Sequence, residues 1–297
     1  MEEPRNQDTD RALGFAIPHR HARGRLVRLG PALVQVLAAH AYPPAIERLL
    51  GEALTLTALI GTTLKDEGSQ LTMQTRSDAG VVRLLVCDYR DGVVRGYVDY
   101  DADALAAAPD RPTLPDLFGD GYLAITFDLV ASGERYQGIV PLDGETMAAA
   151  AESYFVQSEQ IPTLIRFGWG TDEHGQPVAG ALLLQHLPEG ELGRERLHVR
   201  LDHPEWEHVA TLGRTAEPTE LADPTLPLET LLWRLFNEDE VRVLGPVALR
   251  WGCRCDREHF AGVLARFPAD ERAEMADADG VIQVDCQFCA SVYRIPA

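Results

Sequence analysis

The residues best placed to do chemistry are four cysteines near the C-terminus. They form one pair separated by a single residue and a second pair separated by two: Cys253, Cys255, Cys286 and Cys289. Four thiolates at this spacing can complete a tetrahedral shell around zinc, which binds soft sulfur ligands and has no redox chemistry of its own. The paired thiols are also close enough along the chain to react with each other. The pattern therefore indicates a structural metal clip, a thiol switch, or both.

A switch follows if an oxidant removes the ligands. The thiolate is the form that oxidants attack, and a disulfide across C-x-C closes a strained ring of the labile, regulatory kind. Residues 245–297 contain few apolar side chains. Metal binding contributes roughly 10–16 kcal/mol in small metallo-domains, so it would decide whether this piece folds. We expect loss of the metal to unfold it.

Composition limits the partners of the chain. The net charge is −19, and residues 245–297 hold six Arg against eight Asp or Glu, so no nucleic-acid partner is expected. No apolar run reaches the length of a membrane span, and no membrane partner is expected. The first ten residues are acidic and lack the features of a secretory signal. We therefore expect a cytoplasmic protein whose thiols are kept reduced.

The elements that must position these thiols begin with an α+β domain over residues 1–187, with an antiparallel sheet and packed helices. Residues 1–23 are polar, and we expect them to be poorly ordered at the start. Turn sequences and alternating patterns predict strands at 24–29, 70–76, 81–89, 93–100, 122–130, 135–140, 163–169 and 178–187. Helical periodicity predicts helices at 31–41, 44–64 and 144–157.

The sequence pattern predicts a charged helical linker over residues 188–244. It predicts a small zinc-binding domain over residues 245–297. Between 189 and 244 there are 13 acidic and six basic residues. A short helix is expected around Trp206. One apolar stripe on a second helix consists of Leu228, Leu231, Leu232, Leu235 and Phe236. The segment is either an ordinary linker or a piece of low local stability that its neighbours hold folded.

The sequence gives weaker support for a functional role of the other candidate residues. Cys87 lies in a strand pattern and is expected in the core. His259 follows the first cysteine pair, but four thiolates already complete the metal shell. Ser158 and Glu159 have no nucleophile elbow or partner histidine, and no phosphate-binding loop is present, so we expect neither catalysis nor ATP use. The alternative is an enzyme or nucleic-acid-binding module with a purely structural zinc ribbon.

Several blocks resemble the redox-regulated 33 kDa heat-shock chaperone family. The zinc region of that family is similar to W-G-C-R-C-D-R-E at 251–258 and V-D-C-Q-F-C at 284–289. A further block, Y-F-V-Q-S-E-Q-I-P-T at 154–163, and shorter ones at 51–53, 64–68 and 182–188 extend the likeness over nearly the whole chain. One departure is Asp256, where the family commonly has Ser.

The resemblance implies a bacterial, cytoplasmic, ATP-independent holdase that is inactive while reduced and loaded with one Zn²⁺. Oxidation would form disulfides Cys253–Cys255 and Cys286–Cys289, release zinc, unfold the C-terminal domain and linker, and produce a homodimer that binds unfolding client proteins. Short loops also favour this pairing, and Cys87 should stay a free thiol. Without support from the zinc domain, the apolar stripe should become exposed to clients.

Overall fold

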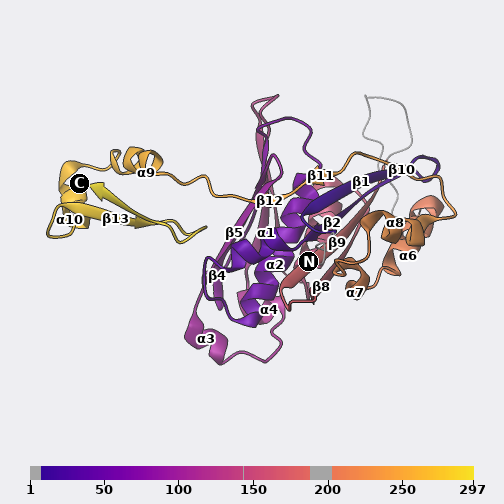
Figure 1. Ribbon diagram of the computed structural model, residues 1–297, viewed down its shortest axis with the longest axis horizontal. Coiled ribbons are helices and arrows are strands. Elements are labelled where there is room, and N and C mark those ends of the chain that lie inside the picture. Colours follow the sequence, from indigo (N-terminus) through magenta and orange to yellow (C-terminus); the bar gives the residue numbers. More distant parts are fainter. Residues whose placement is uncertain (1–7, 143, 188–202) are drawn as a thin grey trace, which may run out of the picture.

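Two six-stranded sheets and a projecting C-terminal arm make up the protein in this computed structural model (Figure 1). The structure describes residues 8–142, 144–187 and 203–297. Our expectations for residues 1–7 and for the first part of the linker, 188–202, lie outside that range. The α+β class with antiparallel sheets is confirmed, but the single sheet that we predicted is in fact two. The division of the chain at residues 187 and 244 stays a prediction.

The first sheet has the strand order β10-β1-β2-β9-β8, and β11 also pairs with β1. All its pairings are antiparallel. Its strands are β1 Arg11–Ile17, β2 Ala22–Leu29, β8 Thr163–Thr171, β9 Pro177–His186, β10 Arg242–Val243 and β11 Val247–Ala248. We had predicted no strand within residues 1–23, but β1 is a full strand there. Its alternating side chains Leu13, Phe15 and Ile17 are buried.

The second sheet has the order β12-β5-β4-β3-β6-β7 and contains the predicted meander and hairpin. Its strands are β3 Gln70–Arg76, β4 Val82–Arg90, β5 Val93–Tyr100, β6 Tyr122–Asp128, β7 Arg135–Pro141 and β12 Arg250–Trp251. Asp91 and Gly92 form the tight β4–β5 turn with φ of 50° and 77°. Two short helices, α3 Ala102–Ala106 and α4 Leu114–Phe118, follow β5. Among the described strands of this sheet, β12 pairs in parallel, with β5, and the others pair antiparallel.

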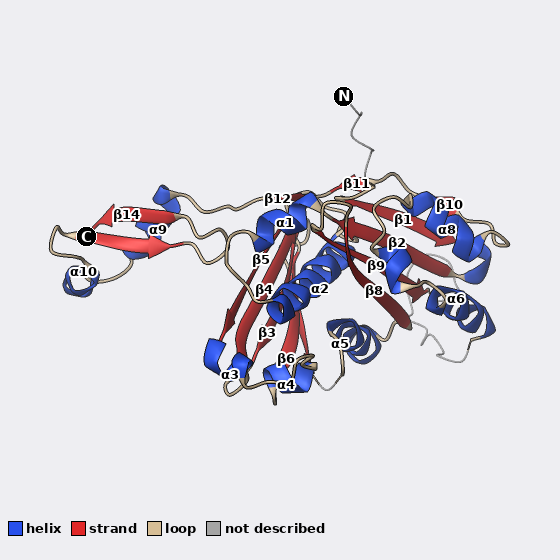
Figure 2. Cartoon of the chain, turned by 60° about the horizontal axis from the view of Figure 1, so that its bottom comes forward, coloured by secondary structure: helices blue, strands red, loops and turns tan. Residues whose placement is uncertain are grey.

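The long helix α2, Pro44–Gly61, lies between the two sheets, next to α1 Pro31–Leu37 and α5 Met147–Tyr154 (Figure 2). It is apolar on nearly every side because it packs on both sheets at once. The hydroxyls of Thr55 and Thr57 donate to carbonyls one turn earlier, each at 2.7 Å, which allows these polar side chains to be buried. The predicted helices are confirmed with shorter ends, and a π-helical turn, Phe155–Glu159, follows α5.

Three helices cover the other face of the first sheet: α6 Pro204–Arg214, α7 Pro218–Leu221 and α8 Leu228–Phe236. Because this sheet is buried on both faces, β9 reads as a continuous apolar run. Leu182 and Leu184 face the core with α6 and α8, whereas Leu183 faces the core with α2. These helices and both sheets together are called the body below.

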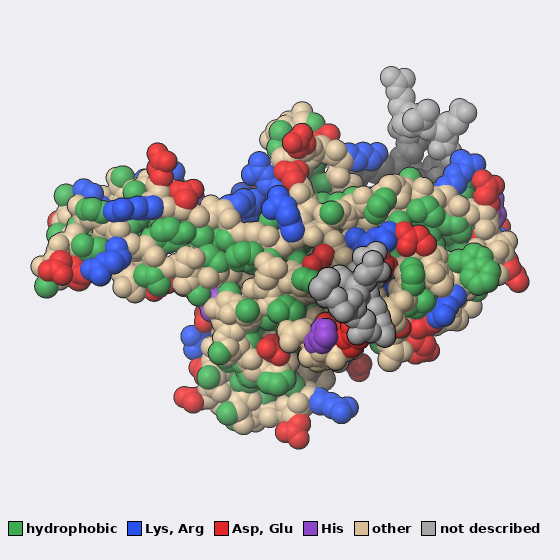
Figure 3. All heavy atoms as spheres, viewed as in Figure 1, with side chains coloured by type: hydrophobic (Ala, Val, Ile, Leu, Met, Phe, Trp, Pro, Cys, Tyr) green, Lys and Arg blue, Asp and Glu red, His purple; other side chains and the backbone are tan. Residues whose placement is uncertain are grey.

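The arm, residues 253–297, contains α9 Arg257–Leu264, α10 Ala269–Met275 and the hairpin of β13 Val281–Asp285 with β14 Val292–Pro296. It projects from the body in both ribbon views (Figures 1 and 2). Neither α9 nor α10 has a buried side chain, and only Ile282, Cys286 and Ile295 of the arm are buried. On the face in Figure 3, hydrophobic side chains lie along the arm between charged ones. The arm therefore has almost no apolar core to hold it folded.

Across the described ranges, no helix is both long and apolar enough to cross a membrane.

Candidate metal centre

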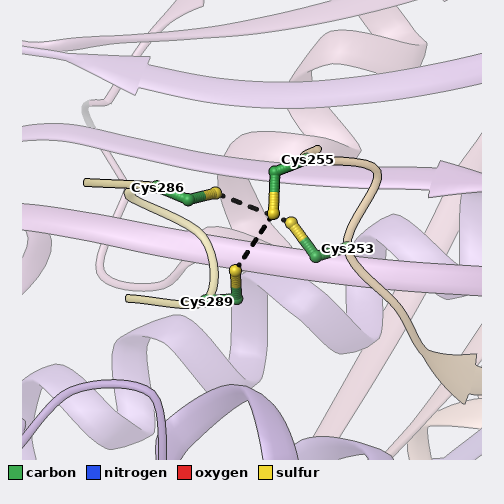
Figure 4. A group of neighbouring side chains, drawn as sticks. All are labelled: Cys253, Cys255, Cys286 and Cys289. Atoms are coloured by element: carbon green, nitrogen blue, oxygen red, sulfur yellow. Dashed lines mark hydrogen bonds between the residues drawn. The ribbon is translucent and has the colours of Figure 1, made fainter. Parts of the chain in front are cut away.

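All four predicted cysteine ligands come together in the arm (Figure 4). Their sulfur atoms lie within 4.8 Å of one another. Two of the sulfur–sulfur separations join the two loops, at 3.6 Å for Cys253–Cys286 and 3.3 Å for Cys255–Cys289. A tetrahedral zinc with Zn–S bonds of about 2.3 Å would place its sulfurs about 3.8 Å apart. The four thiols therefore fit a tetrahedral metal ion.

Two loops present these thiols. Cys253 and Cys255 follow β12 and lead into α9, whereas Cys286 and Cys289 lie in the turn between β13 and β14. That turn is closed by the Cys286 amide, which donates to Ser291 O at 2.9 Å, and by the Ala290 amide, which donates to Cys286 O at 2.8 Å. The Cys289 amide also donates to Cys286 O, at 3.3 Å. These hydrogen bonds fix the positions of Cys286 and Cys289 within the hairpin turn.

Polar neighbours surround the sulfurs. The Tyr293 hydroxyl lies 3.2 Å from the Cys255 sulfur and donates to the Cys255 carbonyl at 3.2 Å. Ser291 Oγ lies 3.3 Å from the Cys289 sulfur. Asp256 caps α9 by accepting the His259 amide at 2.7 Å. Ser and Asp are both good helix caps, so the departure at Asp256 keeps the local structure.

The thiols differ in acidity. Burial raises the pKa of Cys255 to about 12 and also raises the pKa of Cys286. Burial acts in the same direction on Cys289, but hydrogen bonding with the side chain and backbone of Ser291 outweighs it and lowers the pKa of Cys289 to about 7. Four adjacent thiolates repel one another, so full ionisation needs a cation among them. Metal binding must therefore displace protons.

The cysteine loops also dock the arm on the body. The Arg254 guanidinium, between the first two ligands, donates to Gln70 Oε1 at 2.7 Å and Asp88 Oδ2 at 3.1 Å. The Arg95 guanidinium lies 4.0 Å from the centre of the Phe288 ring, and His40 Nε2 is 2.8 Å from the Gln287 carbonyl. We call the four body residues His40, Gln70, Asp88 and Arg95 the docking patch. We did not predict the docking patch from the sequence. The signal that could have indicated it is that Arg254 and Phe288, which lie between the ligands of each pair, can contact a partner surface.

The other candidates take structural positions. Cys87 is fully buried in β4, where burial raises the pKa of its thiol, and this confirms the prediction of a core residue. The metal-binding group found among the described residues contains only cysteines, so His259 is outside it. Glu159 accepts a hydrogen bond from the Tyr154 hydroxyl at 2.8 Å and lies with Ser158 in the turn after α5.

The apolar stripe of α8 is buried, but not against the arm. Its five side chains pack with residues of β1, β2, β8 and β9 on the outer face of the first sheet. The Phe15 and Phe236 ring centres are 5.8 Å apart. We expected the zinc-binding domain to support this stripe directly, and that expectation is wrong. The sheet supports it, because β1 supplies an apolar face that we had not predicted.

Fold and site together define a class of protein: a body of two sheets that carries a four-thiol metal centre on a weakly packed arm. A family model described as "Hsp33 protein" matches residues 10–296. A "33 kDa chaperonin" from Caulobacter vibrioides (strain NA1000 / CB15N) is 42% identical over 288 residues, which are 95% of this chain and 93% of that one. Another, from Cronobacter sakazakii, is 37% identical over 93% of this chain and 88% of its own length.

Among solved structures, the 33 kDa chaperonin of Thermotoga maritima, a heat shock protein 33 homologue, shares the fold with a TM-score of 0.79. Its sequence identity is 22%, and the match covers 97% of this chain and 95% of that one. This chain belongs to the Hsp33 family. The family resemblance predicted from the motifs is confirmed, and membership supports a role as a chaperone.

Proposed function

We propose that this protein is an ATP-independent holdase that oxidation activates through its four cysteines. The observation that carries the proposal is a complete set of four thiols in an arm with almost no buried apolar side chains, within a chain of this family. When bound, one Zn²⁺ would hold the four thiolates and tie the two cysteine loops together. The reduced arm would then stay folded and docked, and the protein would be inactive.

Oxidation would convert the thiols to disulfides. Each pair of thiolates gives up two electrons as its S–S bond forms. One hydrogen peroxide accepts these electrons and two protons from solvent, and its O–O bond breaks to give two water molecules, so both pairs together consume two peroxides. We expect disulfides Cys253–Cys255 and Cys286–Cys289. Bridges within each loop would leave the loops unconnected, whereas bridges between the loops, Cys253–Cys286 and Cys255–Cys289, would join them covalently. Only the first pairing lets the arm open.

Unfolding of the arm would destabilise the linker through the segment that connects the two. Residues 242–252, called the strap below, run from α8 to Cys253 and pair with β1 and β5 as β10, β11 and β12. Each of these strands has only two residues, so they have little stability of their own. Unfolding of the arm removes their anchor at one end. The helices α6 to α8 would then loosen from the first sheet.

Loosened helices would expose apolar surface to clients. The five stripe residues Leu228, Leu231, Leu232, Leu235 and Phe236 are the proposed client-binding side chains, together with the sheet face that they now cover. Acidic neighbours would keep the opened segment in solution. We further propose that the oxidised protein is a homodimer, that it acts in the cytoplasm without catalysis, and that its net charge of −19 disfavours nucleic acid.

A light-scattering assay with a thermally unfolding client tests the proposal. The zinc-loaded reduced protein should not suppress aggregation, and the peroxide-treated protein should suppress it while about one Zn²⁺ per chain is released to a chromogenic chelator. Peptide mapping should find the two disulfides within the loops and a free Cys87. Cys87→Ala is the matched control, because it removes the thiol without placing a hydroxyl in the core, and it should be activated as the wild type is. A protein that releases zinc without gaining suppression would instead have a structural zinc ribbon.

Removing the metal without oxidation tests the role of the arm. Chelation of the reduced protein should abolish amide protection in residues 253–297, because three buried side chains cannot hold the arm folded. Hydrogen exchange in β2 to β9 should hardly change. Since zinc binding displaces protons from these thiols, the chelator concentration that is required should fall as the pH falls. Full protection of the arm after metal removal would contradict the proposed switch.

A further inference from the structure

The strap holds three apolar side chains at alternating positions against the body. Val247, Leu249 and Trp251 all pack on the core that contains α2, and Leu249 is only 5% exposed. The residues between them, Ala248 and Arg250, are exposed. This spacing of two is that of a β-strand with one face buried. The strap therefore fills an apolar surface of the body in an extended conformation.

The strap backbone adds to the edges of both sheets. The Leu244 amide donates to Gly14 O and the Leu249 amide to Asp10 O, each at 2.8 Å. On the other sheet, the Arg250 amide donates to Gly92 O at 2.9 Å and the Gly252 amide to Val94 O at 3.2 Å. Gly92 permits this approach, because a Cβ there would lie 2.5 Å from Ala248 O. The body thus offers backbone acceptors in two places to one extended chain.

Backbone and apolar contacts hold the central strap with little sequence selectivity. Within the described residues, Arg250 has no ion pair, and the Arg242 guanidinium pairs only with Glu240, inside the same segment. Val243 and Leu244 are 52% and 51% exposed. Gly252 alone separates Trp251 from the first metal ligand, so loss of the metal frees the C-terminal end of the strap directly. Its release would open the edges of β1 and β5 and uncover the apolar surface beneath.

We propose that the edges of β1 and β5, together with the apolar surface of the body on which Val247, Leu249 and Trp251 pack, form a client-binding site. The strap occupies this site in the reduced protein. The occupant after activation is an extended segment of an unfolding protein with apolar side chains at alternating positions. It binds by strand addition: main-chain hydrogen bonds provide affinity, and the apolar surface of the body selects segments with apolar side chains at alternating positions. This inference rests on the proposed holdase function, and it adds which kind of client segment binds at this surface.

An extended client suits this surface better than a strap from a second copy of the chain. A second strap would restore the same contacts and leave the surface covered, whereas an oxidised holdase needs it open. Contacts to backbone and to apolar side chains accept many sequences, as a holdase requires. The body presents no ion pair to the described strap residues 247–251 that would select one partner sequence.

Competition with a synthetic strap tests the inference on the full chain. The probe is a fluorescein-labelled peptide with the sequence of residues 245–252, Gly-Pro-Val-Ala-Leu-Arg-Trp-Gly. It should bind the oxidised, zinc-free protein at least tenfold more tightly than the reduced, zinc-loaded protein, and it should compete with a thermally unfolding client. The matched control carries N-methyl groups at the Leu249 and Arg250 amides. It keeps the side chains but lacks the donors to Asp10 O and Gly92 O, and should bind at least tenfold more weakly.

A strap variant tests the same site without oxidation. Leu249→Ser removes the buried anchor, so the reduced variant should bind the peptide while it still contains one zinc. Ala248→Ser, at the exposed neighbouring position, should not.

The possible outcomes separate the proposals. Equal binding of the N-methylated peptide, or binding that does not depend on oxidation, would overturn strand addition. If the peptide converts an oxidised dimer to monomers but does not compete with the client, the surface belongs to a second copy and the inference is wrong. If the oxidised protein suppresses aggregation and the peptide has no effect on it, only this inference fails. Absence of any suppression overturns the proposed function as well.

Discussion

Arg28 of β2 is a single side chain that fixes the connection between α6 and α8 to the first sheet. Its guanidinium donates to Leu221 O at 2.8 Å, Leu226 O at 2.6 Å and Glu220 O at 3.0 Å. The side chain is fully buried, and burial lowers its pKa to about 10, so it stays charged at neutral pH. A buried charge of this kind is tolerated because its donors are satisfied. The backbone of the linker is thereby held by a residue of the body.

Replacing Arg28 with Met should release this connection. The apolar stem is largely kept, but four carbonyls lose their donor, those of Leu221, Leu226 and Glu220 and that of Asp8, which Arg28 contacts at 3.2 Å. Each buried unpaired group costs about 1–3 kcal/mol. Hydrogen exchange should show lost protection in residues 218–236 of the reduced protein, and aggregation suppression should appear without oxidation. Arg23→Met is the control, since Arg23 is exposed on the same strand and bonds Gln185. Equal protection in both variants would contradict the role of Arg28.

Sequence reasoning found the cysteine ligands but could not find Arg28. Ligand spacing is local, and zinc chemistry restricts the residue types, so four cysteines in two tight pairs predict their own site. An arginine in a strand pattern, by contrast, predicts a solvent-facing position. The partners of Arg28 lie about 190 residues away and are carbonyl groups, which carry no side-chain signal. Arg254 and Phe288 were visible between the ligands, but their partners on the body were not.

At the scale of elements, the end of α8 is tied to two other parts of the chain by Asp239. Its fully buried carboxylate accepts from Arg20 Nε at 2.8 Å and lies 3.1 Å from both His19 Nε2 and His208 Nε2. Arg20 and His19 belong to the turn between β1 and β2, and His208 belongs to α6. Burial alone would raise the pKa of Asp239, but these hydrogen bonds outweigh it and lower the pKa.

Acid should therefore loosen α6 and α8 from the body. A carboxylate whose pKa is lowered by folding contributes stability above its unfolded pKa of about 3.9, and this stability is lost as the pH falls through the folded value. Hydrogen exchange of residues 204–236 in the reduced protein should rise below about pH 4, once corrected for the intrinsic rate. Asp239→Asn should show lower protection at neutral pH and a flatter acid response. An unchanged acid response in Asp239→Asn would assign the effect to other carboxylates.

The elements that we predicted correctly are those with a long, regular pattern. The meander β3–β4–β5 has alternating side chains and clear turn residues, and α2 has helical periodicity over many turns. The strands β10, β11 and β12 have two residues each, which is too short for a pattern to repeat. β1 follows a polar N-terminal stretch, so we did not predict it as a strand. Its pairing with β2, β10 and β11 is visible in the structure alone. Helices α9 and α10 bury no side chain, so no apolar stripe indicates them.

At the scale of the whole molecule, the loops that ligate the metal are also those that dock the arm. Arg254 lies between two ligands and bonds Asp88, while Phe288 lies between the other two beneath Arg95. Asp88 also accepts two hydrogen bonds from Arg95, at 2.8 Å and 2.6 Å, and one from Gln70 at 3.4 Å, so these three residues of the docking patch form a connected network. Any change in the cysteine loops must move these two side chains. Metal state and arm position are therefore coupled through the same few residues.

Replacing Phe288 with Ala should separate docking from metal binding. The variant loses the contact with the Arg95 guanidinium, worth about 0.5–2 kcal/mol, but keeps all four thiols. The reduced protein should keep one zinc per chain, and small-angle scattering should show a larger radius of gyration because the arm swings away from the body. Phe267→Ala is the matched control, since Phe267 is 40% exposed elsewhere in the arm. If the radius of gyration stays at the wild-type value while zinc is retained, the docking patch does not position the arm. If the arm separates and aggregation suppression stays absent, arm position alone does not activate the protein, and release of the strap must follow from unfolding of the cysteine loops themselves.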